Sequence, residues 1–409
     1  MEVYRARWLL PVAGDPVENG AIAVDRGRVT DVGKASTLRG DSVQDLGDCI
    51  LLPGFVNAHT HLELSCYRGC VAPKPLWEWF DELIVMRLRA EAAAEEREAV
   101  RLGAAESLAA GVTCVGDISR MGIQVDVLQA SPIRKVCFLE LISGAHVPPH
   151  DAASLASALD RASAFAEPQR LILGVSPHAL YTVTWDDLVG AGTLAAEHKA
   201  PLTIHLLETA DEAPWLATGS GRLQEQLSKY RLPTASQGLR GRAIELLQQT
   251  GIAGQRPLLA HVNYIDDREL QSLAASGAAV VWCPRSHRFF GHGPHRWREM
   301  LAAGINVCIG TDSLASNDTL SILDELRFVR RTVSDVPLDT ILEMGTLRGA
   351  MALSMERHVG SLQIGKCADF MAVPWDRAGS GNPILNLLDG DRPVCGTWIG
   401  GVDVTRQGG

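Results

Sequence analysis

Several features that would assign a chain to a function class are scarce or missing here. The 409 residues contain no run of about 20 apolar residues, the length that a membrane-spanning helix needs. The first stretch, MEVYRARWLLPVAG, has neither a long apolar core nor a small-residue cleavage site, so we expect no signal peptide. Lys and Arg number 38 against 48 Asp and Glu, a net charge of −10 without a basic cluster. Nucleic acid and anionic membranes are therefore poor candidates as partners.

The nine cysteines show no recognisable spacing pattern either. They are scattered singly, and the closest pair, Cys66 and Cys70, does not have CxxC spacing. An odd, unpatterned set of thiols is typical of a reducing cytoplasm, which is where we expect this chain. No strand-like run is followed by GxGxxG, and no other phosphate loop occurs. A metal-free nucleotide-binding module and a doubly wound sheet are therefore disfavoured.

The sequence does have two β-rich ends around a differently patterned middle. Short strand-like runs with turn signals fill the first fifty residues, and GSLQIGKCADFMAVP and RPVCGTWIGGVDVT resemble them near the end. The middle alternates apolar strands with helix-length amphipathic runs such as 91–111 and 266–277, each closed by a glycine. The expected strands are 50–58, 112–118, 134–141, 170–177, 201–207, 257–263, 278–284 and 306–311.

Eight strands alternating with helices predict an α/β fold, a (β/α)8 TIM barrel. We place the barrel at residues 51–355. Residues 1–50 and 356–409 are expected to form one small β-sandwich domain from both termini.

Residues that bind metals or carry protons recur where the expected strands end. They are His59, His61, Asp117, Glu140, His178, His205, His261, Ser286 and Asp312. In a parallel barrel these ends meet at one face, where the chemistry takes place. His59 and His61, two residues apart in NAHTHLELS, point to the same side of a strand and can share one partner.

Together with His205 and Asp312, this pair predicts a metal site. Imidazole and carboxylate ligands suit zinc or ferrous iron, and no cysteine lies among these positions, which favours a catalytic site over a structural one. We interpret Asp117 and Glu140 as helix caps or arginine partners. His178 is either a core histidine bonded to a carbonyl or a residue of the site.

Six motifs in a fixed order give the sequence a family resemblance. PGFVNAHTHLELS, SPHALYTVT, HLLET, LAHVNYID, CPRSH and GTDSLASN resemble the amidohydrolase superfamily, and in particular its cytosine-deaminase-like branch of adenosine-type, guanine and triazine deaminases. The resemblance covers nearly the whole chain. It implies that one divalent metal is held by His59, His61, His205 and Asp312, and we favour zinc over iron.

The same resemblance implies the other roles. Glu208 would be the proton shuttle, His261 would orient the attacking water, and Asp312 would accept a hydrogen bond from that water. His178 would lie where such enzymes usually contact the substrate. Apart from the resemblance, we expect His287 and Trp79 to contact the substrate as well. The chemistry agrees, because deamination needs hydroxide near neutral pH, and a metal lowers the pKa of bound water from ~16 to ~7. A carboxylate that is not a ligand can then carry the proton.

These features favour a hydrolytic deaminase of an aminated purine. HLELS, HLLETADEAPWLATGSG and SHRFFGH resemble members that act on 5′-modified adenosines. The alternatives are a triazine, guanine or other amidine or amide hydrolase on the same scaffold. A non-catalytic scaffold protein would be expected to have lost ligand residues, which are intact here. A homo-oligomer is compatible with the sequence.

Two segments near the expected site depart from the pattern or allow two interpretations. CPRSHRFFGHGPHRW, residues 283–297, has His287 where relatives commonly carry asparagine, and it adds His292 and His295. We interpret it as a glycine- and aromatic-rich loop that shapes the substrate pocket rather than as a second metal site. In PLWEWFDEL, the aromatic residues form either a lid over the substrate or one face of a helix packed on the barrel; they are Trp77, Trp79 and Phe80.

Overall fold

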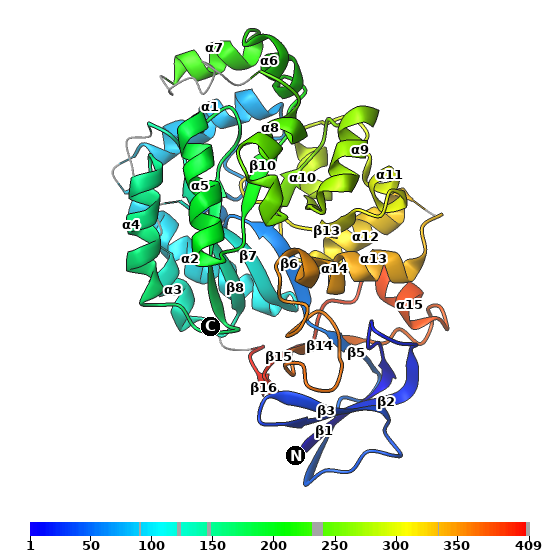
Figure 1. Cartoon of the computed structure of the whole chain (residues 1–409). Coiled ribbons are helices and arrows are strands. Elements are labelled where there is room, and N and C mark those ends of the chain that lie inside the picture. The colour runs from blue at the N-terminus through cyan, green and yellow to red at the C-terminus, as the bar shows by residue number, and fades with distance from the viewer. Residues whose placement is uncertain (90, 121–123, 145–148, 231–239, 334, 406–409) are drawn as a thin grey trace.

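The computed structural model describes the chain except residues 90, 121–123, 145–148, 231–239, 334 and 406–409 (Figure 1). Strands from both ends of the chain form one sheet, which lies at one end of the molecule. Its order is β16-β15-β14-β5-β1-β2-β3, with β4 paired to β1. The strands are β1 (Glu2–Leu9), β2 (Val17–Asp25), β3 (Arg28–Lys34), β4 (Ser42–Asp45), β5 (Cys49–Pro53), β14 (Phe370–Pro374), β15 (Gly396–Ile399) and β16 (Val402–Asp403).

The middle of the chain forms two parallel sheets of four strands each, which confirms the predicted α/β class. The first is β6 (Phe55–Thr60), β7 (Val112–Arg120), β8 (Arg134–Leu141) and β9 (Leu171–Pro177). The second is β10 (Thr203–Leu206), β11 (Leu258–His261), β12 (Ala279–Trp282) and β13 (Asn306–Ile309). An isolated β-bridge links the two sheets at each of two edges, Thr60 with Asp312 at one edge and Val175 with Leu202 at the other.

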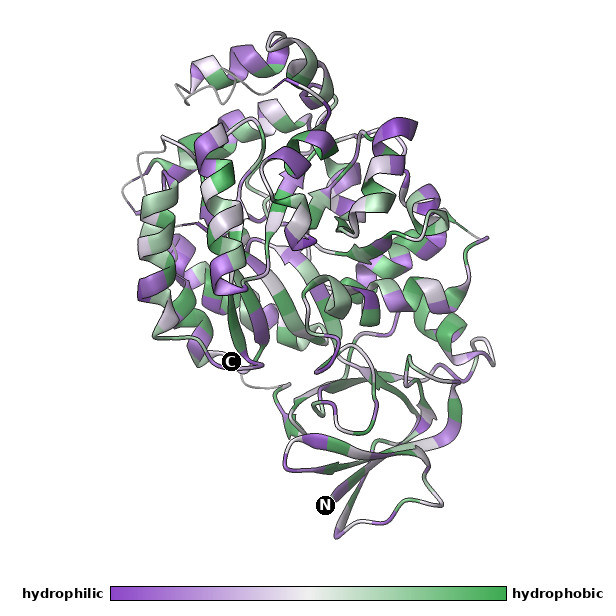
Figure 2. Ribbon diagram, viewed as in Figure 1, coloured by the Kyte–Doolittle hydropathy of each residue, from purple (hydrophilic) through white to green (hydrophobic). Residues whose placement is uncertain are grey.

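One core cluster draws residues from both parallel sheets. It includes Val56, Ala58, Cys114, Val136, Phe138, Leu258, Ala260, Val281 and Cys308. These positions alternate along their strands, so one face of each sheet contributes to a shared interior. Figure 2 shows the hydrophobic residues gathered along the central strands, while the surrounding helices have mixed faces.

Helices and short 3-10 turns connect the strands. They are η1 (Leu62–Tyr67), α1 (Leu76–Arg87), α2 (Ala92–Ala109), α3 (Val125–Ala130), α4 (Ala152–Ser163), α5 (Trp185–His198), α6 (Glu212–Thr218), α7 (Arg222–Lys229), α8 (Ala243–Gln249), η2 (Ala253–Gln255), α9 (Asp267–Ser276), α10 (Pro284–Phe289), α11 (Trp297–Ala302), α12 (Ile322–Thr332), α13 (Leu338–Met344), α14 (Leu347–Ala352) and α15 (Pro383–Asp389). No helix of the described residues combines the length and apolar character needed to cross a membrane.

Local chemistry explains why α9 follows its predicted bounds. The Asp266 side chain caps the helix by accepting a hydrogen bond from the Glu269 N–H, and Gly277 ends it with a φ of 72°. Glycine adopts this left-handed conformation without steric cost, so it terminates helices readily.

Two expectations are corrected by the structure. The predicted strand 50–58 is two strands in different sheets, and the chain crosses between them at Gly54. A Cβ at Gly54 would lie 2.1 Å from Thr113 Oγ1, so only glycine lets the two sheets meet there. The predicted loop 283–297 begins with helix α10, because Pro284 is preorganised for a first helical turn and the glycines come only after Phe289.

Candidate active site

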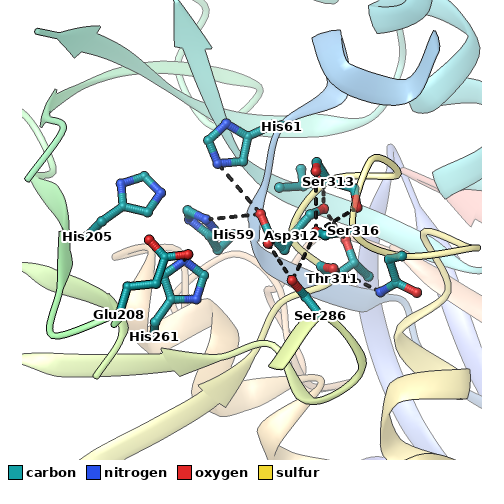
Figure 3. Close-up of polar contacts among 12 residues, drawn as sticks. His59, His61, His205, Glu208, His261, Ser286, Thr311, Asp312, Ser313 and Ser316 are labelled. Atoms are coloured by element: carbon teal, nitrogen blue, oxygen red, sulfur yellow. Dashed lines mark hydrogen bonds and ion pairs between the residues drawn. The ribbon is translucent and has the colours of Figure 1, made fainter. Parts of the chain in front are cut away.

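The four residues predicted to bind metal lie together at the strand ends (Figure 3). One ring nitrogen from each of His59, His61 and His205 lies within 4.8 Å of the other two. Asp312 Oδ1 is 3.9 Å from His59 Nε2 and 3.7 Å from His61 Nε2. His59 lies on β6 and His61 directly follows it, His205 lies on β10, and Asp312 lies in the turn after β13, so the fold gathers them from positions far apart in sequence.

The surroundings of these side chains fit a metal ion. Both ring nitrogens of His59 are buried and have no hydrogen-bond partner among the described residues, which is costly unless another ligand uses them. His205 Nδ1 donates to the His178 carbonyl at 3.0 Å, which leaves Nε2 with a free lone pair. Burial lowers the pKa of His205 to about 3 and the pKa values of His59 and His61 well below the ordinary value. All three imidazoles are therefore neutral, the form that binds metals.

Two hydroxyl groups hold Asp312 in place. Ser286 Oγ donates to Asp312 Oδ2 at 2.6 Å and Ser316 Oγ donates to the same atom at 3.0 Å. Oδ1 is thereby left facing the histidines. Asp312 has a φ of 58°, a left-handed conformation that is unusual for residues other than glycine, and Thr60 Oγ1 donates to its carbonyl. Ser286 was singled out from the sequence, whereas Ser316 was missed although it lies within the GTDSLASN motif.

Glu208 and His261 form a second pair beside the ligands. Glu208 Oε1 lies 3.5 Å from His261 Nε2, and Figure 3 shows both side chains next to His59 and His205. Burial raises the pKa of Glu208 to about 8, with a further contribution from Asp312. A carboxyl group with a pKa near neutrality can both accept and donate a proton under working conditions.

The turn that carries Glu208 is fixed by a residue that the sequence analysis missed. The buried Glu212 carboxylate accepts three consecutive backbone N–H groups, from Leu207 at 2.8 Å, Glu208 at 2.6 Å and Thr209 at 3.1 Å. Asn263 Nδ2 adds a hydrogen bond to the Glu208 carbonyl at 3.0 Å. The available signal was the spacing in HLLETADE, where a second glutamate follows Glu208 by one helical turn.

The residues predicted to contact substrate lie in three different settings. His178 Nδ1 is 2.7 Å from the Thr182 hydroxyl, so its partner is not the carbonyl of the core interpretation. His287 Nδ1 lies 3.0 Å from Asn263 Oδ1, which links it to the turn of Glu208, and its Nε2 donates to the Gly293 carbonyl.

Trp79 lies on α1 and connects that helix to the active-site loops. Its Nε1 donates to the Ala315 carbonyl at 2.9 Å, three residues after Asp312, and its ring packs edge-on against Phe290. Trp79 is buried in a separate hydrophobic cluster with Leu64 and Tyr67. These contacts agree with the interpretation of α1 as a packed helix, and the lid over the substrate stays a prediction.

The remaining strand-end residues divide into structural and unexplained ones. Asp117 Oδ1 accepts the Leu62 N–H at the start of η1, in agreement with the interpretation as a cap. Glu140 Oε1 is buried without a partner in the described part of the chain, so the interpretation as a cap or arginine partner stays a prediction for this residue. His292 Nδ1 lies near the Tyr264 hydroxyl, and His295 Nε2 donates to the His261 carbonyl. Neither histidine belongs to a group with metal-binding geometry among the described residues.

Comparison with known proteins agrees with this geometry. Residues 50–404 match the Amidohydrolase family. The chain is 29% identical over 397 residues to the 5-methylthioadenosine/S-adenosylhomocysteine deaminase of Syntrophobacter fumaroxidans, which covers 92% of this chain and 85% of that protein.

Two solved structures have the same fold. Helicobacter pylori aminofutalosine deaminase in complex with methylthio-coformycin has a TM-score of 0.84 at 22% identity, covering 99% of this chain and 100% of that one. A zinc complex of atrazine chlorohydrolase from Arthrobacter aurescens has a TM-score of 0.83 at 21% identity, covering 99% and 95%.

Proposed function

The chain belongs to the amidohydrolase family, and we propose that it is a metal-dependent hydrolytic deaminase that releases ammonia from a 5′-modified adenosine. The observation that carries this proposal is the strand-end cluster of His59, His61, His205 and Asp312 with a non-ligand carboxyl group, Glu208, beside it. The names of the similar deaminases support an aminated purine as substrate.

The proposal includes an architecture. The two parallel sheets close into a (β/α)8 barrel over residues 51–355, supported by the bridges on both sides and by the shared interior cluster. Residues 1–50 and 356–409 form a small β-sandwich domain, supported by the sheet that contains strands from both termini.

His59, His61, His205 and Asp312 would hold one divalent metal, with zinc preferred over iron. A divalent ion at this position supplies the Lewis-acid chemistry that makes water nucleophilic near neutral pH. The neutral imidazoles and the free Oδ1 of Asp312 provide the donor set for it.

The other residues handle the proton. Glu208 takes a proton at its carboxylate and delivers it to the ring nitrogen and then to the leaving amine, a task that suits its raised pKa. His261, 3.5 Å from Glu208, orients the attacking water, and Asp312 accepts a hydrogen bond from it. His178, His287 and Trp79 contact the substrate, with the sugar extending toward residues 283–297.

A substrate screen tests the proposal. Ammonia release is measured for adenosine, 5′-methylthioadenosine, S-adenosylhomocysteine, guanine and an aminotriazine, with metal analysis of the same protein sample. We expect release from the 5′-modified adenosines and loss of activity after chelation. Activity on guanine or triazines alone would replace the nucleoside assignment by the alternative amidine hydrolase.

A further inference from the structure

His261 lies in a strained turn at the end of β11. Its φ is 71°, and that of the next residue, Val262, is 52°. Left-handed backbone is unfavourable for residues that have a Cβ, and most of all for β-branched residues such as valine. Such a conformation persists only where the surrounding structure imposes it. The imidazole that this turn carries has its Nε2 atom 3.5 Å from Glu208 Oε1.

The carbonyl of His261 lies just beyond the last residue pair of a strand ladder. β11 and β12 pair in parallel, and on β11 the residue pairs end at Ala260. At the start of this ladder the Pro257 carbonyl, four residues earlier and on the same side of the strand, accepts the Ala279 N–H at 3.1 Å. At its end a side chain replaces the backbone donor, because His295 Nε2 donates to the His261 carbonyl at 2.8 Å. A buried backbone acceptor that the sheet leaves open is satisfied in this way.

Aromatic packing holds the ring of His295. It stacks on Trp282 with ring centroids 5.1 Å apart and an interplanar angle of 19°, and Trp282 stacks on Trp297 at 5.4 Å and 18°. Trp282 ends β12 and Trp297 begins α11, so the imidazole is fixed against two elements of the fold. Burial lowers the pKa of His295 to about 3, so the ring is neutral. Its single proton lies on Nε2, because the carbonyl can only accept a hydrogen bond.

This hydrogen bond controls the direction of the His261 imidazole. The carbonyl belongs to the peptide unit between His261 and Val262, and this unit is planar, so holding it fixes ψ of the first residue and φ of the second. The N–H of the same unit donates to the Leu206 carbonyl at 3.0 Å. The unit is therefore held by β10 on one side and by His295 on the other. Without the bond from His295, the strained backbone can relax and the imidazole moves away from Glu208.

We propose that His295 is a positioning residue, whose Nε2–H holds the left-handed turn at His261 and so keeps that imidazole beside Glu208 and the attacking water. This inference rests on the proposed function, in which His261 orients the water. It deepens that function by giving a task to one of the two histidines that residues 283–297 add to the family pattern. His295 acts through the backbone of its neighbour and binds neither the metal nor the substrate.

The test separates the N–H of His295 from the ring that carries it. His295→Phe keeps a flat ring for the stack on Trp282 but cannot donate, whereas His295→Gln loses the ring and keeps an N–H at a similar reach. We expect kcat for 5′-methylthioadenosine to fall by roughly tenfold to a hundredfold in His295→Phe, because a shift on the order of 1 Å can cost about a hundredfold. KM and metal content should stay at their wild-type values, and His295→Gln should recover most of the lost kcat.

Thr397→Val is the matched control for the loss of a buried donor. Thr397 Oγ1 donates to the Leu108 carbonyl at 2.8 Å, and it lies on β15, in the sheet formed by both ends of the chain. This variant should lower the free energy of unfolding, as His295→Phe does, and leave kcat unchanged.

Three kinetic results would overturn the role of the His295 N–H. They are a wild-type kcat in His295→Phe, a loss that His295→Gln does not recover, and a rise in KM at unchanged kcat, which would make His295 a substrate contact. If His295→Phe does not fold, His295→Met replaces it, because methionine has nearly the shape of glutamine without the donor. If His295→Gln is the only variant that folds, the N–H serves folding rather than the reaction, and the proposal fails.

A measurement without turnover separates this inference from the function on which it rests. A wild type that releases no ammonia from 5′-methylthioadenosine overturns the proposed function. The imidazole NMR signals of His261 in the metal-loaded protein still test the role of His295. They should shift in His295→Phe and return toward the wild-type positions in His295→Gln, and identical signals in all three proteins contradict the proposal.

Discussion

Replacing Glu212 by glutamine should damage catalysis through the turn that carries Glu208. The two oxygens of Glu212 accept three backbone N–H groups, Leu207 on Oε2 and both Glu208 and Thr209 on Oε1. Glutamine keeps one oxygen, so it can retain the two bonds of Oε1, but its NH2 group then opposes the Leu207 N–H. One charge-assisted hydrogen bond is lost and one buried donor is left unpaired, which costs roughly 2–3 kcal/mol.

The catalytic effect follows from the position of Glu208. A shift on the order of 1 Å at a proton-transferring group can cost about a hundredfold, so we expect kcat to fall by roughly tenfold to a hundredfold. Burial raises the pKa of Glu212 to about 8, so turnover is measured above that pH, where the wild-type side chain is ionised. Denaturant unfolding and metal content are measured on the same samples.

Glu269→Gln provides the matched control for this experiment. Glu269 accepts N–H groups of Ala243 at 2.7 Å and Ile244 at 3.1 Å, at the start of α8. The substitution removes the same kind of buried hydrogen bond, so we expect a similar loss of unfolding free energy with wild-type kcat. Wild-type turnover in Glu212→Gln, or an equal loss of turnover in Glu269→Gln, would refute the argument that Glu212 acts by positioning Glu208.

Three further outcomes are expected. Elemental analysis should find close to one zinc or iron per chain, and His205→Ala should lose it; two ions per chain that survive His292→Ala and His295→Ala would contradict a single site. The affinity for the metal should change little down to a pH one unit below 6.5, because burial lowers the pKa values of His59, His61 and His205 and keeps these side chains neutral. Three histidines with the ordinary pKa would each lower the metal affinity roughly tenfold at that pH, a decrease that competition titrations would detect. Free adenine should have a much lower kcat/KM than a 5′-extended adenosine, since remote binding energy positions the base, and equal values would argue against a nucleoside substrate.

Much of the parallel-sheet region could be predicted from periodicity alone. Apolar runs bounded by turn residues gave each central strand to within a few residues, and β8 matches its predicted range at both ends. The exception at Gly54 has a physical cause. Residues 50–56 include no polar or charged side chain, and the close approach of Thr113 shows that the chain changes sheets at Gly54.

The positions of the proposed metal ligands could also be predicted from the sequence, because parallel strands end at one face of the fold. What the sequence could not provide was the hydrogen bonding between those ends. Ser286 and Ser316 meet on Asp312 across the space between two turns. Glu140 Oε1 has no hydrogen-bond partner among the described residues because of how its neighbours pack in three dimensions, which no local sequence pattern encodes.

Glu208→Gln tests the central claim most directly, when ammonia release from 5′-methylthioadenosine and bound metal are measured on the same preparations. Glutamine keeps the shape of the side chain and cannot carry the proton. The account predicts unchanged metal content with turnover reduced by a factor on the order of a hundred or more. Near-normal turnover in the metal-loaded variant would place the proton transfer elsewhere and contradict the account.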